Sequence, residues 1–211
     1  MARQTSMTRQ TPTTDKNTLR QQALAKRRGL TSAERASASN LIQQRLIEYL
    51  AQAPEGDIQL KSAPLLIYRA LSDEVDTEHL FESCAELSGR DVYAPVTHEA
   101  GHMQWHRIDA QTRWQRGNFG ILEPSSGALW SPEENPAVLA CPLVGFDRKG
   151  NRLGLGKGCF DRWLAGVKNH ILLRIGLAFA CQECPAIAAE EHDIPLDIII
   201  TEGEIITCRN C

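Results

Sequence analysis

The stretch that most constrains the fold and the site of this chain is Gly145-Phe-Asp-Arg-Lys-Gly-Asn-Arg-Leu-Gly-Leu-Gly-Lys-Gly-Cys-Phe-Asp-Arg-Trp-Leu164. Upstream of it, the apolar run over residues 137–144 predicts a buried strand, although Pro142 interrupts the run. Residues 147–150 have the composition of a turn. After the glycines, apolar residues recur at helical spacing, so we expect a helix to begin near Phe160.

Three glycines at alternate positions, Gly154, Gly156 and Gly158, precede this helix, with Lys157 between the last two. Glycines let backbone N–H groups approach an anion closely, and a helix N-terminus favours negative charge, so this stretch can form a phosphate cradle. The spacing fits neither a P-loop, because Asn151 replaces its first glycine, nor the G-x-G-x-x-G dinucleotide fingerprint. A surface turn with incidental basic residues is the alternative, and composition leaves both open.

Residues 150–162 resemble the C-terminal signature of the 5-formyltetrahydrofolate cyclo-ligases, whose pattern is close to G-x-R-L-G-x-G-x-G-Y-Y-D-R. Three further segments are similar to that family, and they extend the resemblance from Lys16 to about Glu202: K-x-x-L-R at 16–20, E-V-D-T at 74–77 and F-G-I-x-E-P at 119–124. The chain departs from the family at Cys159 and Phe160, where tyrosines are usual, and at Arg69, where an apolar or small residue is common.

The resemblance implies ATP- and Mg²⁺-dependent cyclisation of 5-formyltetrahydrofolate to 5,10-methenyltetrahydrofolate, with release of ADP and phosphate. It implies a nucleotide site made by Lys16, Arg20, Arg152, Gly154, Leu155, Gly156, Lys157, Gly158, Cys159 and Phe160. It assigns substrate contacts to Arg69, Glu74, Gly156, Lys157 and Gly158, magnesium to Asp161 and Asp193, and catalysis to Arg20, Arg152 and Lys157.

Elementary chemistry gives four of these residues a second interpretation. Lys16 and Arg20 share a helix face, which is also typical of a solvated basic surface. Glu74 suits the donor pair of a pterin ring, but an acid there can also stabilise a helix N-terminus. Asp161 would repel phosphate unless Mg²⁺ lies between them, and it too can stabilise a helix N-terminus.

Strands alternating with helices predict a three-layer α/β/α domain with a largely parallel central sheet, and the resemblance implies the ribose-phosphate isomerase/CoA-transferase-like superfold. We expect one domain over 15–205, a disordered tail over 1–14 and a short cysteine-containing tail over 206–211. The expected helices are 16–28 and one capped at Thr31, with an apolar stripe of Ala38, Leu41, Ile42, Leu46 and Leu50. A later helix should bury Leu80, Phe81, Cys84 and Leu87. Expected strands cover 64–68, 92–96, 103–108, 171–180 and 196–201.

Bulk composition limits the classes of function. A net charge of −3 and a pI near 6.1 argue against a nucleic-acid partner. No apolar run reaches the ~18 residues of a membrane span. Residues 1–14 lack an apolar signal region, so we expect a cytoplasmic monomer that acts on a small molecule. Two C-x-x-C pairs, 181/184 and 208/211, are either free thiols or a structural zinc site.

Two other functions fit the same sequence. One is a non-catalytic member of the fold that holds folate or nucleotide without turnover, which the departures at Arg69 and Cys159 leave open. The other is a sugar-phosphate isomerase of the same superfold, which would need a buried acid–base carboxylate in place of ATP.

Overall fold

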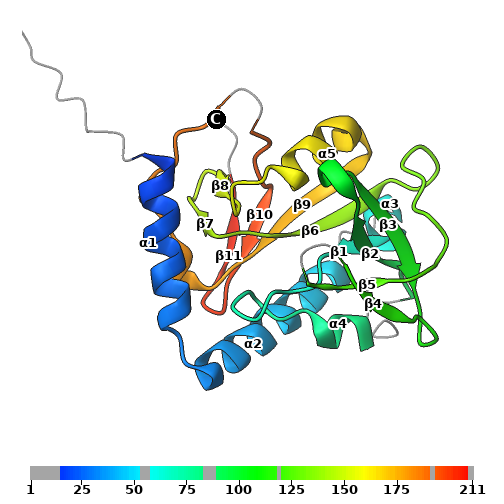
Figure 1. Ribbon diagram of the computed structural model, residues 1–211, viewed down its shortest axis with the longest axis horizontal. Helices are drawn as coiled ribbons and strands as arrows, with labels where there is room; N and C mark the ends of the chain where they lie inside the picture. The colour runs from blue at the N-terminus through cyan, green and yellow to red at the C-terminus, as the bar shows by residue number, and fades with distance from the viewer. Residues whose placement is uncertain (1–14, 53–57, 83–88, 118–119, 191–192, 209–211) are drawn as a thin grey trace, which may run out of the picture.

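The computed structural model describes residues 15–52, 58–82, 89–117, 120–190 and 193–208 (Figure 1). Within these ranges, seven strands form a central sheet in the order β11-β10-β9-β6-β1-β2-β3. The inner pairings are all parallel, and only the edge strands β3 and β11 pair antiparallel. The strands are β1 (Leu65–Ile67), β2 (Val92–Thr97), β3 (Met103–Ile108), β6 (Ala137–Pro142), β9 (Ile171–Leu177), β10 (Ile198–Ile200) and β11 (Ile205–Thr207).

Helices and small ribbons complete the described fold. The helices are α1 (Lys16–Gly29), α2 (Ser32–Ala51), α3 (Ile58–Ser62), α4 (Glu78–Glu82) and α5 (Cys159–Val167), with 3-10 turns η2 (Glu99–Gly101), η3 (Lys168–His170) and η4 (Ala180–Gln182). Two antiparallel ribbons pair β4 (Trp114–Arg116) with β5 (Leu122–Pro124), and β7 (Gly145–Phe146) with β8 (Arg152–Leu153). The predicted capping box at Thr31 and Glu34 is present.

Both faces of the sheet are buried. Successive side chains of a strand point to opposite faces, so neighbouring residues join different core clusters. From β1, Leu65 and Ile67 join a core cluster with Ile42 and Leu46 of α2. Leu66, between them, joins a second cluster, which contains Leu164 of α5. Figure 1 shows α2 and α5 on opposite sides of the sheet. The expected three-layer α/β/α arrangement is therefore confirmed.

Local details differ from the sequence expectations. Leu41 is 44% exposed, whereas the polar side chains of Ser39 and Gln43 are buried, so the apolar stripe of α2 is narrower than predicted. Ordered structure continues past residue 205, because β11 pairs with β10 and Cys208 is buried. A strand of three residues is too short for its hydrophobic pattern to distinguish it from an irregular tail in the sequence. Cys84 and Leu87 lie outside the described residues.

The order in which the chain adds strands to the sheet changes direction at β1. From β1 it proceeds to β2 and β3 on one side, and it then returns to β6, β9 and β10 on the other. The gap between the carboxyl ends of β1 and β6 is therefore a topological switch point, the place where open α/β sheets bind ligands. No helix among the described residues is long and apolar enough to cross a membrane.

Candidate active site

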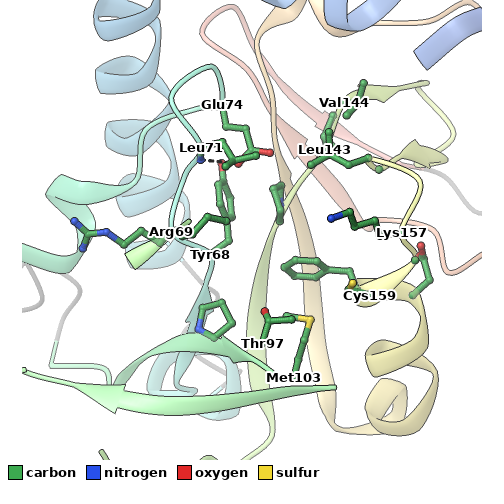
Figure 2. A pocket seen from close by; sticks show the side chains of 18 of the residues that line it. Tyr68, Arg69, Leu71, Glu74, Thr97, Met103, Leu143, Val144, Lys157 and Cys159 are labelled. Carbon is green, nitrogen blue, oxygen red and sulfur yellow. Dashed lines mark hydrogen bonds between the residues drawn. The ribbon is translucent and has the colours of Figure 1, made fainter. Parts of the chain in front are cut away.

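A cavity of about 360 Å³ lies at this switch point (Figure 2). One wall is the segment that follows β1, a second is the segment that follows β6, and a third is the glycine-rich turn with the start of α5. Of the residues selected from the sequence, Arg69, Glu74, Arg152, Gly154, Leu155, Lys157, Gly158, Cys159, Phe160 and Asp161 line this cavity. Residues as far apart in the chain as 69 and 161 thus meet in one place.

The glycine-rich turn has the backbone that the sequence predicts. Gly156 has φ +90° and Gly158 has φ +62°, conformations that residues with a Cβ rarely adopt. Gly158 is the N-cap of α5, which begins at Cys159, one residue before the expected start. The turn therefore brings glycine N–H groups and a helix N-terminus to the cavity, an arrangement that suits a phosphate group.

Two cations of the stretch have different environments. Lys157 lines the cavity, and Figure 2 shows its side chain directed into the cavity from the side opposite Glu74. Arg152 is nearly buried, with 6% of its side chain exposed, and it forms an ion pair with Asp161 and a hydrogen bond to the carbonyl of Ile194. Arg152 therefore connects the start of α5 to the segment that precedes β10.

Arg20 of α1 contacts the glycine-rich turn from outside the cavity. Its Nε donates to the carbonyl oxygen of Gly154 at 2.8 Å, and its Nη1 donates to Asn17 Oδ1 at 2.6 Å. A Cβ built on Gly156 would lie 3.9 Å from the Arg20 guanidinium carbon. Arg20 is half-buried, with its guanidinium held against the turn by these contacts.

Lys16 and Asp193 do not line the cavity, and they contact each other instead. Lys16 Nζ lies 2.7 Å from Asp193 Oδ2 and 2.9 Å from Glu190 Oε1. Partial burial opposes the charge of Lys16, but the hydrogen bonds to Asp193 and Glu190 prevail and raise its pKa above its ordinary value. Asp193 also accepts from the backbone N–H of Glu190 at 2.9 Å.

Asp161 is the predicted magnesium ligand that reaches the cavity. Its side chain is 34% exposed, and the ion pair with Arg152 engages Oδ1. Mg²⁺ is usually held by one or two carboxylates together with substrate phosphates and water. One carboxylate beside a phosphate cradle fits that pattern. Asp193 is connected to the cavity only indirectly, because its neighbour Ile194 accepts a hydrogen bond from Arg152. The role of Asp193 as a magnesium ligand stays a prediction.

Glu74 lies on the β1 side of the cavity and is buried, with 8% of its surface exposed. Its Oε2 accepts from the backbone N–H of Leu71 at 2.9 Å (Figure 2). Burial raises the pKa of Glu74, while the Leu71 hydrogen bond and the Arg27 guanidinium oppose that rise. The helix-capping alternative does not apply to Glu74, because the backbone N–H of Glu78 at the start of α4 donates to Asp76 instead.

Arg69 lines the cavity, but its charged end points away from it in Figure 2. The guanidinium carbon lies 4.4 Å from the Trp114 ring centroid and 5.6 Å from that of Phe81. Its Nη2 lies 2.5 Å from Glu78 Oε1. The guanidinium thus stabilises the contact between α4 and β4. The substrate contact predicted for Arg69 is therefore left to the part of this residue that lines the cavity.

The cavity is also lined by residues to which the sequence assigned no site role. Glu123 of β5 is buried and its Oε1 accepts from the backbone N–H of Thr97 at 3.0 Å. It belongs to the segment 119–124, a motif whose Gly and Pro also suit a tight turn; residue 119 lies outside the described ranges. The other lining residues are Tyr68, Leu71, Pro95, Thr97, Met103, Ile121, Pro142, Leu143 and Val144. Trp105 of β3 does not line the cavity and is buried in the core.

The cysteines of the C-x-x-C pairs are separate thiols in the described ranges. Cys181, Cys184 and Cys208 carry no disulfide, and burial raises the pKa of Cys208 to about 11. Cys211 lies outside the described residues. Within the described part of the chain, no group of three or more metal-binding side chains gathers.

The comparisons with known proteins agree with the geometry. The model of the 5-formyltetrahydrofolate cyclo-ligase family matches residues 12–202. The 5-formyltetrahydrofolate cyclo-ligase of Haemophilus influenzae is 31% identical over 178 residues, which are 82% of this chain and 91% of that protein. That of Mus musculus is 27% identical over 197 residues, 89% of this chain and 93% of the relative.

Two solved structures are similar throughout. The 5,10-methenyltetrahydrofolate synthetase of Aquifex aeolicus aligns with a TM-score of 0.73 and 30% identity, covering 93% of this chain and 94% of its own. That of Mycoplasma pneumoniae aligns with a TM-score of 0.68 and 25% identity, covering 90% and 99%. The chain therefore belongs to the 5-formyltetrahydrofolate cyclo-ligase family of enzymes.

Proposed function

We propose that this protein converts 5-formyltetrahydrofolate to 5,10-methenyltetrahydrofolate with ATP, releasing ADP and phosphate. The observation that carries the proposal is one cavity that has the carboxylate of Glu74 on one side and Lys157 of the glycine-rich turn on the other. A carboxylate suits the 2-amino and N3–H donors of a pterin, and a glycine-rich turn at a helix N-terminus suits a triphosphate. The names of the relatives support the same reaction.

The reaction needs ATP because the formyl oxygen of an amide leaves poorly as oxide. In the proposed sequence this oxygen attacks the γ-phosphorus of ATP, ADP departs, and an iminium phosphate remains. N10 then attacks the formyl carbon and loses its proton, and phosphate leaves with the former formyl oxygen. Every step rearranges bonds between bound substrates, so the protein must chiefly position them and neutralise negative charge.

The glycine-rich turn and its cations are proposed to perform that task. The N–H groups from Gly154 to Gly158 would hold the phosphates, and Lys157, directed into the cavity, would neutralise charge on the transferring group. Arg152 is held by Asp161 and the Ile194 carbonyl at the edge of the cavity, where it adds a fixed positive charge. Arg20 supports the turn through the Gly154 carbonyl.

Asp161 is the residue that we propose for Mg²⁺. When bound, the ion would supply positive charge that screens the phosphates from the carboxylate of Asp161. Without such a cation, Asp161 and a phosphate on the turn would repel each other. Arg152 neutralises Asp161 only in part, because its guanidinium is shared between Asp161 Oδ1 and the carbonyl oxygen of Ile194.

Cys159 and Phe160 replace the tyrosines that are usual at these positions. Phe160 retains the aromatic ring and lies 6.3 Å from the Trp105 ring centroid in an edge-to-face arrangement. The two phenolic hydroxyls are lost, so we propose that substrate affinity in this chain depends on ring contacts and on Glu74 more than on hydroxyl groups. The cradle itself does not need them.

The test is the absorbance of 5,10-methenyltetrahydrofolate in a mixture of purified protein, 5-formyltetrahydrofolate and Mg²⁺, with and without ATP. We expect a rise that requires ATP. Lys157→Ala should lower kcat by about 10²–10³-fold, because it removes a charge aimed at the reacting phosphate. Lys149→Ala is the matched control, since Lys149 is exposed in the turn before β8. Binding of 5-formyltetrahydrofolate or ATP without any absorbance rise would instead support the non-catalytic binding protein.

A further inference from the structure

Arg27 is a buried cation that takes no part in the proposed reaction steps. It lies near the end of α1 and is 1% exposed, a rare state for an arginine. Together with Lys16 and Arg20 it forms one side of α1. These three cations reach three different segments: Lys16 the segment of Asp193, Arg20 the glycine-rich turn, and Arg27 the segment of Glu74.

The contacts of Arg27 surround the β1 end of the cavity. Its Nη2 lies 2.9 Å from Asp73 Oδ2, and its Nη1 lies 3.8 Å from Glu74 Oε1. The same Nη1 donates to the carbonyl oxygen of Leu143 at 3.4 Å. Glu74 and Leu143 both line the cavity, one after β1 and the other after β6. One guanidinium therefore connects the two walls that meet at the switch point.

Burying this guanidinium is costly, since its Nε has no hydrogen-bond partner among the described residues. A buried ion pair is weak evidence for a gain in stability, because well-packed apolar residues often do as well. The position of the pair therefore requires another explanation, and its neighbourhood supplies one: it is directly behind the carboxylate proposed to bind the pterin.

We propose that Arg27 is a positioning residue, which keeps the Glu74 carboxylate ionised and fixed for the pterin donors of 5-formyltetrahydrofolate. The inference rests on the proposed function of this site. Arg27 offsets the burial of Glu74 and ties its segment to Leu143, so the carboxylate is held at the wall of the cavity before the ligand arrives. Arg27 itself acts through Glu74 and does not contact the ligand.

The charges around Glu74 determine what a pH titration should show. Arg27 faces it from α1, Asp73 precedes it on its own segment, and the hydroxyl-bearing ring of Tyr68 comes from the residue that follows β1. Lys157 shares the cavity from the opposite side, and Arg152, Asp161 and Glu123 line the same cavity. Arg27 opposes the rise in the pKa of Glu74, whereas Asp73 adds to it. Loss of Arg27 should therefore raise this pKa further, and loss of the Asp73 charge should lower it.

The experiment measures the dissociation constant of 5-formyltetrahydrofolate by calorimetry, without ATP, from acidic to neutral pH. Protonated Glu74 is a poorer acceptor, so binding by the unmodified protein should weaken as pH falls through the pKa of Glu74. Arg27→Gln should weaken binding about tenfold at neutral pH and move this inflection to higher pH. Asp73→Asn, a change at a partly exposed position, should move it to lower pH and keeps the test available should Arg27→Gln fail to fold.

A double-mutant cycle separates positioning from general structural damage. In a Glu74→Gln background, Arg27→Gln should change the dissociation constant by less than about twofold, because the group through which it acts is gone. Arg27→Lys should bind folate more tightly than Arg27→Gln but less tightly than the unmodified protein, since lysine has the charge but lacks the branched guanidinium that reaches both walls. Arg28→Gln is the matched control on the same helix, because Arg28 is exposed and contacts Asp73 but not Glu74. Its binding and pH inflection should stay as in the unmodified protein.

Each failure has its own signature. An Arg27→Gln effect of equal size in both backgrounds, or equal losses of ATP and folate affinity, would overturn the positioning role while leaving the proposed function intact. Inflections that stay fixed in both Arg27→Gln and Asp73→Asn would do the same. Full folate affinity in Glu74→Gln would overturn the role of Glu74 and with it that of Arg27. Absence of ATP-dependent product from the unmodified protein would instead reject the proposed function.

Discussion

Arg20 and Gly154 are 134 residues apart in the chain, and the guanidinium Nε of Arg20 donates a 2.8 Å hydrogen bond to the Gly154 carbonyl oxygen. This contact fixes the N-terminal helix to the glycine-rich turn. It also orients the turn, because a carbonyl held on the outside of a turn leaves neighbouring N–H groups free to face inward. The first helix of this chain thus supports the turn that we propose as the phosphate cradle.

Arg20→Ala should therefore weaken the cradle for the nucleotide more than for folate. We expect the KM for ATP to rise about tenfold, equivalent to about 1.4 kcal/mol, the scale of one hydrogen bond from a charged group. The KM for 5-formyltetrahydrofolate should change little. Lys26→Ala, which removes an exposed charge from the same helix, serves as control. A tenfold loss in both variants would indicate only a long-range effect of charge.

Substitutions at Gly154 and Gly156 distinguish a glycine needed for close approach of a ligand from a glycine needed for its backbone conformation. Gly156 has φ +90°, so Gly156→Ala should cost about 1–3 kcal/mol of strain and lower the Tm. Gly154 has no such conformation, and a Cβ built on it meets nothing within 4 Å. Gly154→Ala should therefore leave the Tm unchanged and still raise the KM for ATP, because the methyl group would enter the space of the phosphates. An unchanged KM would show that phosphates do not approach the backbone at Gly154.

Asp161→Asn should raise the Mg²⁺ concentration needed for half-maximal activity by about tenfold, since a neutral amide is a weaker ligand for a hard cation. Saturating Mg²⁺ should recover most of the activity. Asp109→Asn, an equal change of charge in an exposed turn, is the control. The assignment would be wrong if Asp161→Asn lost activity equally at all Mg²⁺ concentrations, since that would point to its ion pair with Arg152 instead.

Thiol labelling offers a test of occupancy that does not depend on turnover. Cys159 lines the cavity and is half-buried, so a maleimide should modify it, and bound ATP should protect it. Cys181 is also half-buried but does not line the cavity, so ATP should not change its labelling rate. Cys141 is buried, which raises the pKa of its thiol to about 11, and it should stay unmodified in the folded protein. Peptide mapping by mass spectrometry measures all three rates at neutral pH.

Local chemistry was readable from the sequence where it depends on neighbours in the chain. Alternating glycines before an apolar helical pattern predicted the turn and α5, and the positive φ angles of Gly156 and Gly158 explain why glycine is needed there. The capping box at Thr31 was equally local. The strands of the parallel core were predicted to within a few residues, because strands buried on both faces appear as unbroken apolar runs.

Contacts between distant segments could not be read in this way. The ion pair of Lys16 with Asp193 joins residues 177 positions apart, and nothing in either local pattern indicates it. Arg27 belongs to a helix face that resembles a solvated basic surface, yet it is buried because two acidic residues after β1 meet it. Glu123 was hidden within a motif that also predicts a simple turn. In each case the partner comes from another element, which only the sheet order brings close.

The central claim is that ATP phosphorylates the formyl oxygen of 5-formyltetrahydrofolate in this cavity. The most direct measurement uses 5-formyltetrahydrofolate labelled with ¹⁸O in the formyl group, with ATP and Mg²⁺, and determines the mass of the phosphate released. The predicted result is phosphate that carries one ¹⁸O atom per turnover, formed about 10²–10³-fold more slowly by Lys157→Ala and at the unmodified rate by Lys149→Ala. Unlabelled phosphate formed alongside 5,10-methenyltetrahydrofolate would contradict the claim, because the formyl oxygen would then have left by another route.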